Sequence, residues 1–257
     1  MDWGEVYFYF LLCLLGACVG SHLNVVVYRL PVKGEYLKNA RSKCPDCGHV
    51  LGLLDLVPVI SYLMLKGRCR YCGKKISARY PLVEIISAAL AVLSFIRFGF
   101  TLASVTAFST ASVLLAVALI DHDTMEIPTS LCVALVPFAV MAVWAFDIPL
   151  LHRIIGAFCV SVPMLLLAVF VEGAFGGGDV KLMAVCGFLL GYQNVLFAFF
   201  VAILTGGGYA LFLLASRRAK RKEHISFGPH LCFGTFLALL YGTEILKLYL
   251  GLFGVNI

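Results

Sequence analysis

The sequence predicts an all-α, polytopic integral membrane protein of about eight transmembrane helices with a small zinc-binding cytoplasmic insert. Hydrophobic residues make up 61% of the 257 positions and charged residues only 13%, far from the balance of a soluble domain. The mean hydropathy is +0.98. Two of the long apolar runs also stop at acidic residues, which are costly next to lipid and for that reason point to function.

Eight apolar runs are candidate spans, because a transmembrane helix needs about 17 to 25 mostly apolar residues. The run nearest the N-terminus is expected to stay as an anchor, since Asp2 and Glu5 precede it without any lysine or arginine, unlike a signal peptide. The shortest run is the sixth. The runs cover residues 6–28, 82–96, 102–120, 129–147, 151–171, 180–192, 194–215 and 230–252.

Polarity and charge divide and orient the chain. We distinguish a first transmembrane helix (1–28), a polar insert (29–80) and a membrane core of about seven helices (81–257). The insert, the segment 216–228 and Lys181 together hold seventeen of the twenty lysines and arginines. Since positive residues favour the cytoplasmic side, both basic segments are expected there and both termini outside. The basic residues lie next to the membrane, which indicates contact with lipid headgroups and not with nucleic acid.

Two C-x-x-C pairs in the insert have the spacing of a four-cysteine zinc ribbon. Each pair brings two thiolates onto one tetrahedral ion, and Gly48 and Gly73 follow where the turn needs permissive backbone. Four thiolates leave no open coordination position, so the zinc is expected to be structural. A disulfide is the weaker alternative in a reducing cytoplasm. The predicted ligands are Cys44, Cys47, Cys69 and Cys72.

Two acidic segments carry the predicted chemistry. Three glycines lead into Asp179 between two apolar runs, and Asp121 stands where the third run stops. With eight spans, both carboxylates lie on the cytoplasmic face. Two carboxylates within a few ångströms share a proton, so one can accept a proton from water while the other donates to a carbonyl or leaving amine. This is the chemistry of an aspartic protease.

Spacing alone leaves alternatives open at both positions. Asp123 and Glu126 compete with Asp121 for the partner role, although Asp121 is nearest the span. Asp179 is explained equally well as a solvated helix N-cap after a flexible glycine loop.

Other charged and polar residues at the spans have structural interpretations beside functional ones. Asn24 is expected to bridge two helices, with a substrate contact as the alternative. Glu84 either pairs with Arg79 or lies near an active site. Lys181 is expected to extend to the interface, and Arg153 is counted with the basic residues of the outer face.

Six separated motifs resemble those of the bacterial type IV prepilin peptidases, which are membrane aspartic proteases of the G-x-G-D type. Together these motifs cover most of the chain. The sequence departs from the family's pattern at His22 and at Thr129, neither of which is a member of the acidic pair. The motifs are residues 20–31, the paired C-x-x-C insert, and residues 79–84, 120–128, 176–181 and 225–229.

The resemblance implies cleavage of the short basic leader of prepilins and pseudopilins at the cytoplasmic side of the bacterial inner membrane. Residue by residue, it implies that Asp121 and Asp179 are the catalytic pair. Many family members with a full-length cysteine-bearing insert also methylate the new N-terminus with S-adenosylmethionine, so this second activity and its cofactor are expected on resemblance alone. No residues for that cofactor are predicted, because the glycines at 206–208 lie within a span and suit close helix packing.

Three other functions remain open at this stage. One is a peptidase without methyltransferase activity, and another is a non-catalytic adaptor that uses only the insert. The third is an ion transporter whose carboxylates mark an ion path, which is disfavoured because both acids lie at one face and no internal repeat is evident. The oligomeric state and the pilin system that supplies the substrate are not predicted.

Overall fold

The computed structural model describes residues 3–32, 41–171, 173, 175–216 and 225–252. Within these residues the secondary structure is helical apart from two isolated β-bridges, which confirms the all-α class. Packing divides the chain into two compact units, Met1–Phe100 and Thr101–Ile257. The elements are α1 (Trp3–Arg29), η1 (Leu53–Asp55), α2 (Ile60–Met64), α3 (Arg79–Phe98), α4 (Leu102–Thr124), α5 (Thr129–Ala145), α6 (Leu150–Cys159), α7 (Ser161–Phe170), α8 (Gly177–Ala215) and α9 (Gly228–Leu252).

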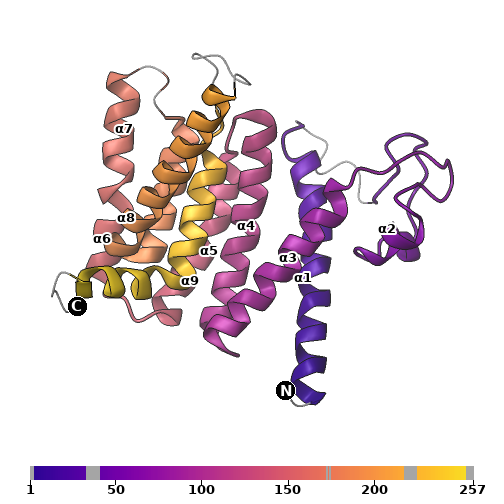
Figure 1. The fold of residues 1–257 in the computed structure, drawn as a ribbon, viewed down its shortest axis with the longest axis horizontal. Helices are drawn as coiled ribbons and strands as arrows, with labels where there is room; N and C mark the ends of the chain where they lie inside the picture. The colour runs from indigo at the N-terminus through magenta and orange to yellow at the C-terminus, as the bar shows by residue number, and fades with distance from the viewer. Residues whose placement is uncertain (1–2, 33–40, 172, 174, 217–224, 253–257) are drawn as a thin grey trace. The chain divides into compact units, whose positions relative to one another are not determined.

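In the first unit, α1 and α3 lie side by side (Figure 1). Gly16 and Gly20 make this close approach possible, since a Cβ at either position would lie 2.7 Å from a backbone atom of α3. The G-x-x-x-G spacing is a known contact motif of membrane helices. Asn24 donates a hydrogen bond of 3.1 Å from Nδ2 to the carbonyl of Tyr80. The prediction that Asn24 bridges two helices is therefore confirmed.

The insert is tied to this helix pair through Glu84. The buried Glu84 carboxylate accepts a hydrogen bond of 2.7 Å from the backbone N–H of Val59. Val59 has a φ of 61°, which is strained for a β-branched residue and persists only where neighbours hold it. Glu84 thus links the segment before α2 to the membrane helix α3.

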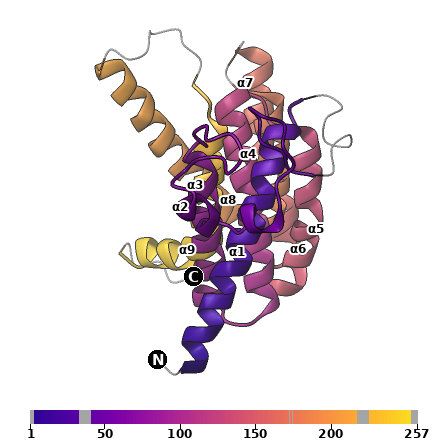
Figure 2. The ribbon, with the colours of Figure 1, turned by 90° about the vertical axis from the view of Figure 1, so that its right-hand side faces the viewer.

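The second unit is a helical bundle built around α8. This helix packs against α5, α6, α7 and α9, while α4 packs against α5 and α9 (Figures 1 and 2). In Figure 2 the C-terminal end of α8 extends beyond its neighbours. The buried apolar side chains include Leu114, Val117, Leu135, Leu182, Val195 and Leu231.

The long helix α8 is broken at Gly191. It has 39 residues, which at about 1.5 Å each give a length of roughly 58 Å, about twice the hydrocarbon thickness of a bilayer. Gly191 has a φ of 74° and a ψ of 167°, which are not helical values and which suit glycine. The predicted boundary between runs 180–192 and 194–215 falls directly beside this break.

Arg153 is fully buried inside the bundle. Its guanidinium satisfies carbonyl groups at two helix ends. One is the end of α5 and the other is the end of the first half of α8, where the break leaves carbonyls without helical partners. The acceptors are the carbonyls of Ala142, Phe146, Ile148, Phe188 and Leu189, at 2.6–3.3 Å. The prediction that counted Arg153 with the basic residues of the outer face concerns a side of the membrane and stays a prediction.

Six helical segments of the described chain are long and apolar enough to cross a membrane. One of them combines α6 and α7, which separate at Val160 because Pro163 has no N–H to bond the carbonyl four residues earlier. Helix α5 is apolar but has 17 residues. The predicted eight separate spans are therefore not shown, since α5 is short and two predicted runs share α8.

Candidate active site

Asp121 lies in the last turn of α4 and is 5% exposed. Its Oδ2 atom accepts two hydrogen bonds, one of 2.5 Å from the Ser226 hydroxyl and one of 2.9 Å from the Gly228 N–H. Gly228 begins α9, and a Cβ at this position would lie 2.5 Å from the same oxygen. The segment before α9 therefore holds the Asp121 carboxylate, and this close approach requires a glycine.

Asp179 is the third residue of α8 and is half-buried. Its Oδ2 atom accepts a hydrogen bond of 3.1 Å from the N–H of Gly176, the N-cap residue of the helix. The N-cap position itself is occupied by Gly176, and Asp179 caps the helix from the third position, as the acidic residue of a capping box does. The capping alternative therefore holds with its position shifted by three residues. A carboxylate in the first turn of a helix is also favoured by the helix dipole.

Three segments bring the two carboxylates to one corner of the second unit. A Cβ on Gly178 would lie 2.7 Å from Cβ of Ile127, so the start of α8 packs tightly against the α4–α5 loop. The rings of Phe175 and Phe227 lie 5.7 Å apart and join the segments before α8 and α9. The segments that carry Asp121 and Asp179 therefore meet at this corner.

The competing acids of the first segment differ from Asp121 in burial. Asp123 and Glu126 are exposed, whereas Asp121 is buried. The chain turns at Met125, which ends α4 in the left-handed conformation with a φ of 55°. Burial and the two donors therefore favour Asp121 as the partner of Asp179.

Lys181 also contributes to this corner. Its Nζ donates a hydrogen bond of 3.1 Å to Oγ1 of Thr129 at the start of α5. Thr129 is one of the two positions at which the sequence departs from the family's pattern. The contact connects the first turns of α5 and α8, next to the acidic pair.

Sequence reasoning missed the residues that support the pair. Ser226 and Gly228 lie in the motif 225–229, which was noted for resemblance but assigned no role. Phe175 and Phe227 were not singled out. The available signal was a polar residue and a glycine immediately before an apolar run, but only the fold reveals that they face Asp121, more than 100 positions away.

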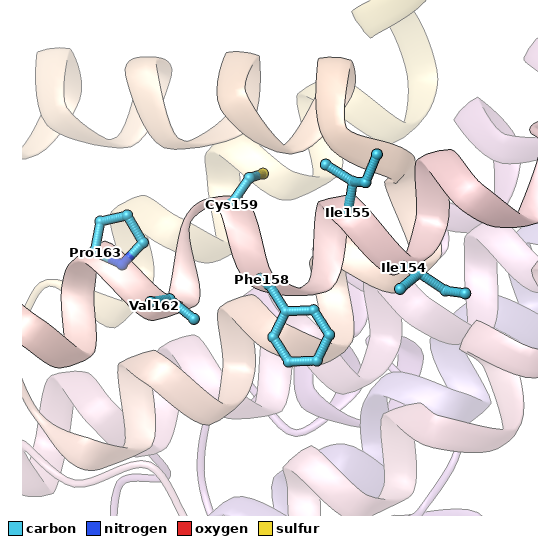
Figure 3. A pocket seen from close by; sticks show the side chains of 6 residues that line it. All are labelled: Ile154, Ile155, Phe158, Cys159, Val162 and Pro163. Atoms are coloured by element: carbon cyan, nitrogen blue, oxygen red, sulfur yellow. The ribbon is translucent and has the colours of Figure 1, made fainter.

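An apolar groove lies on another part of the bundle, at the junction of α6 and α7 (Figure 3). It contains none of the predicted site residues, and its volume is about 460 Å³. Its position within a candidate span and its apolar lining are those of a lipid-facing surface. The groove is lined by Ile154, Ile155, Phe158, Cys159, Val162 and Pro163.

The four predicted cysteine ligands form a cluster in the first unit. All four Sγ atoms lie within 4.8 Å of one another, and those of Cys44 and Cys72 are 3.9 Å apart. A tetrahedral zinc with Zn–S bonds of about 2.3 Å would place its sulfur atoms roughly 3.8 Å apart. Gly48 and Gly73 have φ values of 69° and 71°, as the predicted turns require. The cluster therefore fits a tetrahedral metal ion.

The negative charges of these thiols in their deprotonated form also favour a bound cation. Backbone N–H groups of Cys72 and Tyr71 lower the pKa of Cys69 to about 7. The N–H of Lys74 lowers the pKa of Cys72, but desolvation and hydrogen bonds with the thiols of the other three cysteines of the cluster outweigh it and raise this pKa to about 11. Four thiolates this close repel one another, so a bound cation would stabilise them together.

Comparison with known proteins assigns the family. Residues 14–98 match the Bacterial Peptidase A24 N-terminal domain, and residues 108–211 match the Type IV leader peptidase family. A Prepilin leader peptidase/N-methyltransferase of Bacillus subtilis (strain 168) is 32% identical over 241 residues, covering 93% of this chain and 97% of the relative. The chain belongs to the type IV prepilin leader peptidase/N-methyltransferase family.

Further members of the prepilin leader peptidase family show the same extent of similarity. The protein of the same name from Burkholderia pseudomallei (strain 1026b) is 36% identical, with 90% of this chain and 84% of the relative covered. The one from Pseudomonas aeruginosa PAO1 is 33% identical, with 94% and 93% covered. The comparison with solved structures found no significant match.

Each of the two regions matched to the prepilin peptidase family lies within one packing unit. The four cysteines lie in the region 14–98, while Asp121 and Asp179 lie in the region 108–211. Ser226 and Gly228 lie beyond both regions. The residues that hold the Asp121 carboxylate thus come from outside the matched segments.

Proposed function

We propose that the protein is a membrane aspartic endopeptidase that cleaves the leader peptide of type IV prepilins and pseudopilins, with Asp121 and Asp179 as its catalytic pair. The observation that carries this proposal is the convergence of both carboxylates at one corner of the second unit. The names of the relatives supply the substrate class. Glycine-rich backbone beside Asp179 leaves room for an extended peptide chain.

The proposed mechanism uses a water molecule between the two carboxylates. One carboxylate takes a proton from this water as the oxygen attacks the carbonyl carbon of the scissile peptide bond, and the other carboxylic acid protonates the carbonyl oxygen. Collapse of the tetrahedral intermediate breaks the C–N bond as the leaving nitrogen takes up a proton. No covalent enzyme intermediate is needed, and holding the peptide beside the pair supplies much of the rate.

We place the active site at the cytoplasmic face of the bacterial inner membrane, on the strength of the charge asymmetry. If α8 is divided at Gly191 and both of its halves and α5 are counted as spans, the chain crosses the membrane eight times. Both termini then lie outside, and the insert and the acidic pair lie inside. The domains in this topology are the anchor 1–28, the cytoplasmic insert 29–80 and the protease core 81–257.

Zinc is the proposed ion of the cysteine cluster, where Cys44, Cys47, Cys69 and Cys72 would hold it. Its role would be structural, because four thiolates close the tetrahedral coordination. The described insert has no buried apolar side chain between the two knuckles. A metal would therefore supply the stability that an insert of this size lacks.

The second proposed activity is N-methylation of the newly exposed N-terminus, and it is supported by the relatives' name, which includes N-methyltransferase. S-adenosylmethionine would supply the methyl group when bound. A peptidase without this activity is the alternative. Incubating cleaved pilin with S-adenosylmethionine and the purified protein distinguishes them, because only methyl transfer increases the pilin mass by one methyl group.

The decisive test is leader cleavage by purified protein in detergent or liposomes, with a prepilin as substrate. Asp121→Asn and Asp179→Asn should each lower cleavage by about 100-fold or more, whereas Asp123→Asn, at an exposed position, should retain it. Loss in Asp123→Asn with activity in Asp121→Asn would refute the assignment. Ion flux in liposomes that depends on Asp179, without cleavage, would support a transporter instead.

A further inference from the structure

The Asp121 carboxylate is held on one oxygen only. Oδ2 accepts both the Ser226 hydroxyl at 2.5 Å and the Gly228 N–H at 2.9 Å. An O–H···O distance this short is typical of a hydrogen bond to a charged carboxylate. Within the described residues no hydrogen bond reaches Oδ1, so this oxygen remains for water or substrate.

The Gly228 N–H and the Ser226 hydroxyl place different constraints on the proton of Asp121. A backbone N–H can only donate, so the Gly228 contact requires that Oδ2 be an acceptor, and the two donors at Oδ2 favour Oδ1 for any proton of Asp121. The Ser226 hydroxyl can rotate, and with Oδ2 already an acceptor it donates as well. Together they fix which oxygen of Asp121 is turned away from the reaction.

The segment that carries these donors is itself anchored beside Asp179. Phe227 lies between Ser226 and Gly228 in sequence, and its ring contacts that of Phe175 at a centroid distance of 5.7 Å. Phe175 immediately precedes the turn that leads to Asp179. A shift of the 226–228 segment would therefore disturb both carboxylates, which are otherwise on different helices.

We propose that Ser226 is a positioning residue of the peptidase reaction: with the Gly228 N–H, its hydroxyl orients Asp121 so that Oδ1 faces the reacting water. This inference rests on the proposed function of the acidic pair. Ser226 does not contact substrate in this role. It acts through Asp121, and its effect therefore belongs to the chemical step and not to substrate binding.

Replacement of the hydroxyl provides the test, measured as kcat and KM for prepilin cleavage. Loss of one hydrogen bond to a charged group corresponds to a fall of about 10- to 100-fold, so Ser226→Ala should lower kcat by this factor with KM unchanged. Ser226→Thr keeps the hydroxyl and should recover most of kcat. Ser161 is the matched control, a buried serine of the same unit whose hydroxyl bonds the Ala157 carbonyl, and Ser161→Ala should retain the wild-type kcat.

A second variant addresses the same oxygen without removing the hydroxyl. Gly228→Ala would place a Cβ 2.5 Å from Oδ2 of Asp121 and should lower kcat even with Ser226 present. The proposal is overturned if folded Ser226→Ala or Gly228→Ala cleaves at the wild-type kcat. It is also overturned if Ser226→Ala changes only KM, or if Ser226→Thr is as impaired as Ser226→Ala.

The same assay separates this inference from the function on which it rests. If Asp121→Asn and Asp179→Asn still cleave, the proposed catalytic pair is wrong. If both are inactive while Ser226→Ala has the wild-type kcat, the pair stands and only the role of Ser226 fails.

Discussion

Buried charged groups lie near opposite ends of α5 in the second unit, and they are held in different ways. Near the C-terminal end of α5, the Arg153 guanidinium donates five hydrogen bonds to backbone carbonyls. Near its N-terminal end, Asp121 has one oxygen occupied by two donors, and Asp179 has one oxygen bonded to the N–H of Gly176. Among the described residues, nothing hydrogen-bonds the second oxygen of either carboxylate.

The difference separates a charge with a structural role from the proposed catalytic carboxylates. A guanidinium has five N–H donors, so Arg153 has little capacity left for a ligand. It compensates for helix ends that lipid cannot hydrate. The carboxylates keep unused acceptor capacity beside a glycine-rich turn and so can accept and donate protons to a substrate. Burial alone would not distinguish these two sites, but the number of satisfied polar atoms does.

In the cysteine cluster of the first unit, the charges are thiolates that a metal ion would neutralise. Removing this metal ion is expected to have the largest effect on stability. Chelation, or Cys44→Ser, should unfold the insert, since structural zinc contributes on the order of 10 kcal/mol to such sites. Protease sensitivity of the insert and metal content per chain measure this. Helical circular dichroism of the membrane spans should persist. Cys13→Ser in α1, outside the cluster, is the control, and purified protein without bound metal would contradict the prediction.

Removal of Arg153 should have the next largest effect. Arg153→Met leaves several buried carbonyls without donors, at about 1–3 kcal/mol each before relaxation, so a loss on the order of 5 kcal/mol is expected. Thermal unfolding in detergent measures it. Arg153→Lys has three donors on a single nitrogen and should be intermediate.

Arg97→Met is the control for this prediction, because Arg97 is partly exposed at the end of α3. The comparison would be contradicted if Arg153→Met unfolded at the same temperature as the wild type but lost prepilin cleavage. Arg153 would then act in the reaction and not in the fold.

These cases show which features were accessible from sequence. The apolar runs and the four cysteines could be predicted because each follows from local composition or short spacing, whereas spacing left Asp123 and Glu126 open beside Asp121. The pairing of Asp121 with Asp179 rested on the resemblance. The break in α8 was visible as two adjacent runs. The burial of Arg153 was not predictable, since its acceptors lie at the ends of two other helices and carry no side-chain signal. The contact of Ser226 with Asp121 was missed for the same reason: it depends on how α4 and α9 meet.

The tight packing beside Asp179 gives a smaller effect with a close control. A Cβ on Gly178 would lie 2.7 Å from Cβ of Ile127, whereas a Cβ on Gly177 meets nothing within 4 Å. Gly178→Ala should cost about 1–3 kcal/mol by overpacking and lower prepilin cleavage by displacing Asp179. Gly177→Ala should be neutral or stabilise α8 by up to about 1 kcal/mol. Equal cleavage by the two variants would show that the position of α8 against the loop is unimportant for the acidic pair.

The smallest effect is expected for an ion pair outside the membrane helices, where water replaces lost contacts. Arg70 Nε lies 2.7 Å from Oδ1 of Asp55, with the Arg70 side chain 45% exposed. Burial raises the pKa of Asp55, but hydrogen bonds from Arg70, Gly52 and Tyr71 outweigh it and hold this pKa below its usual range. A lowered pKa means that the stabilisation is complete above the unfolded value of about 4 and is lost as the pH falls through the folded value.

Asp55→Asn should therefore destabilise the insert by about 1 kcal/mol or less, equally at pH 5 and pH 7. Hydrogen exchange of the insert amides at the two pH values measures the difference from the wild type. Asp46→Asn is the control, because the ion pair of Asp46 with Lys74 is more exposed on both sides and should contribute still less. An effect of Asp55→Asn as large as that of Arg153→Met would contradict the comparison, since it would mean that an ion pair with a half-exposed arginine stabilises as much as a buried charge bonded to five carbonyls.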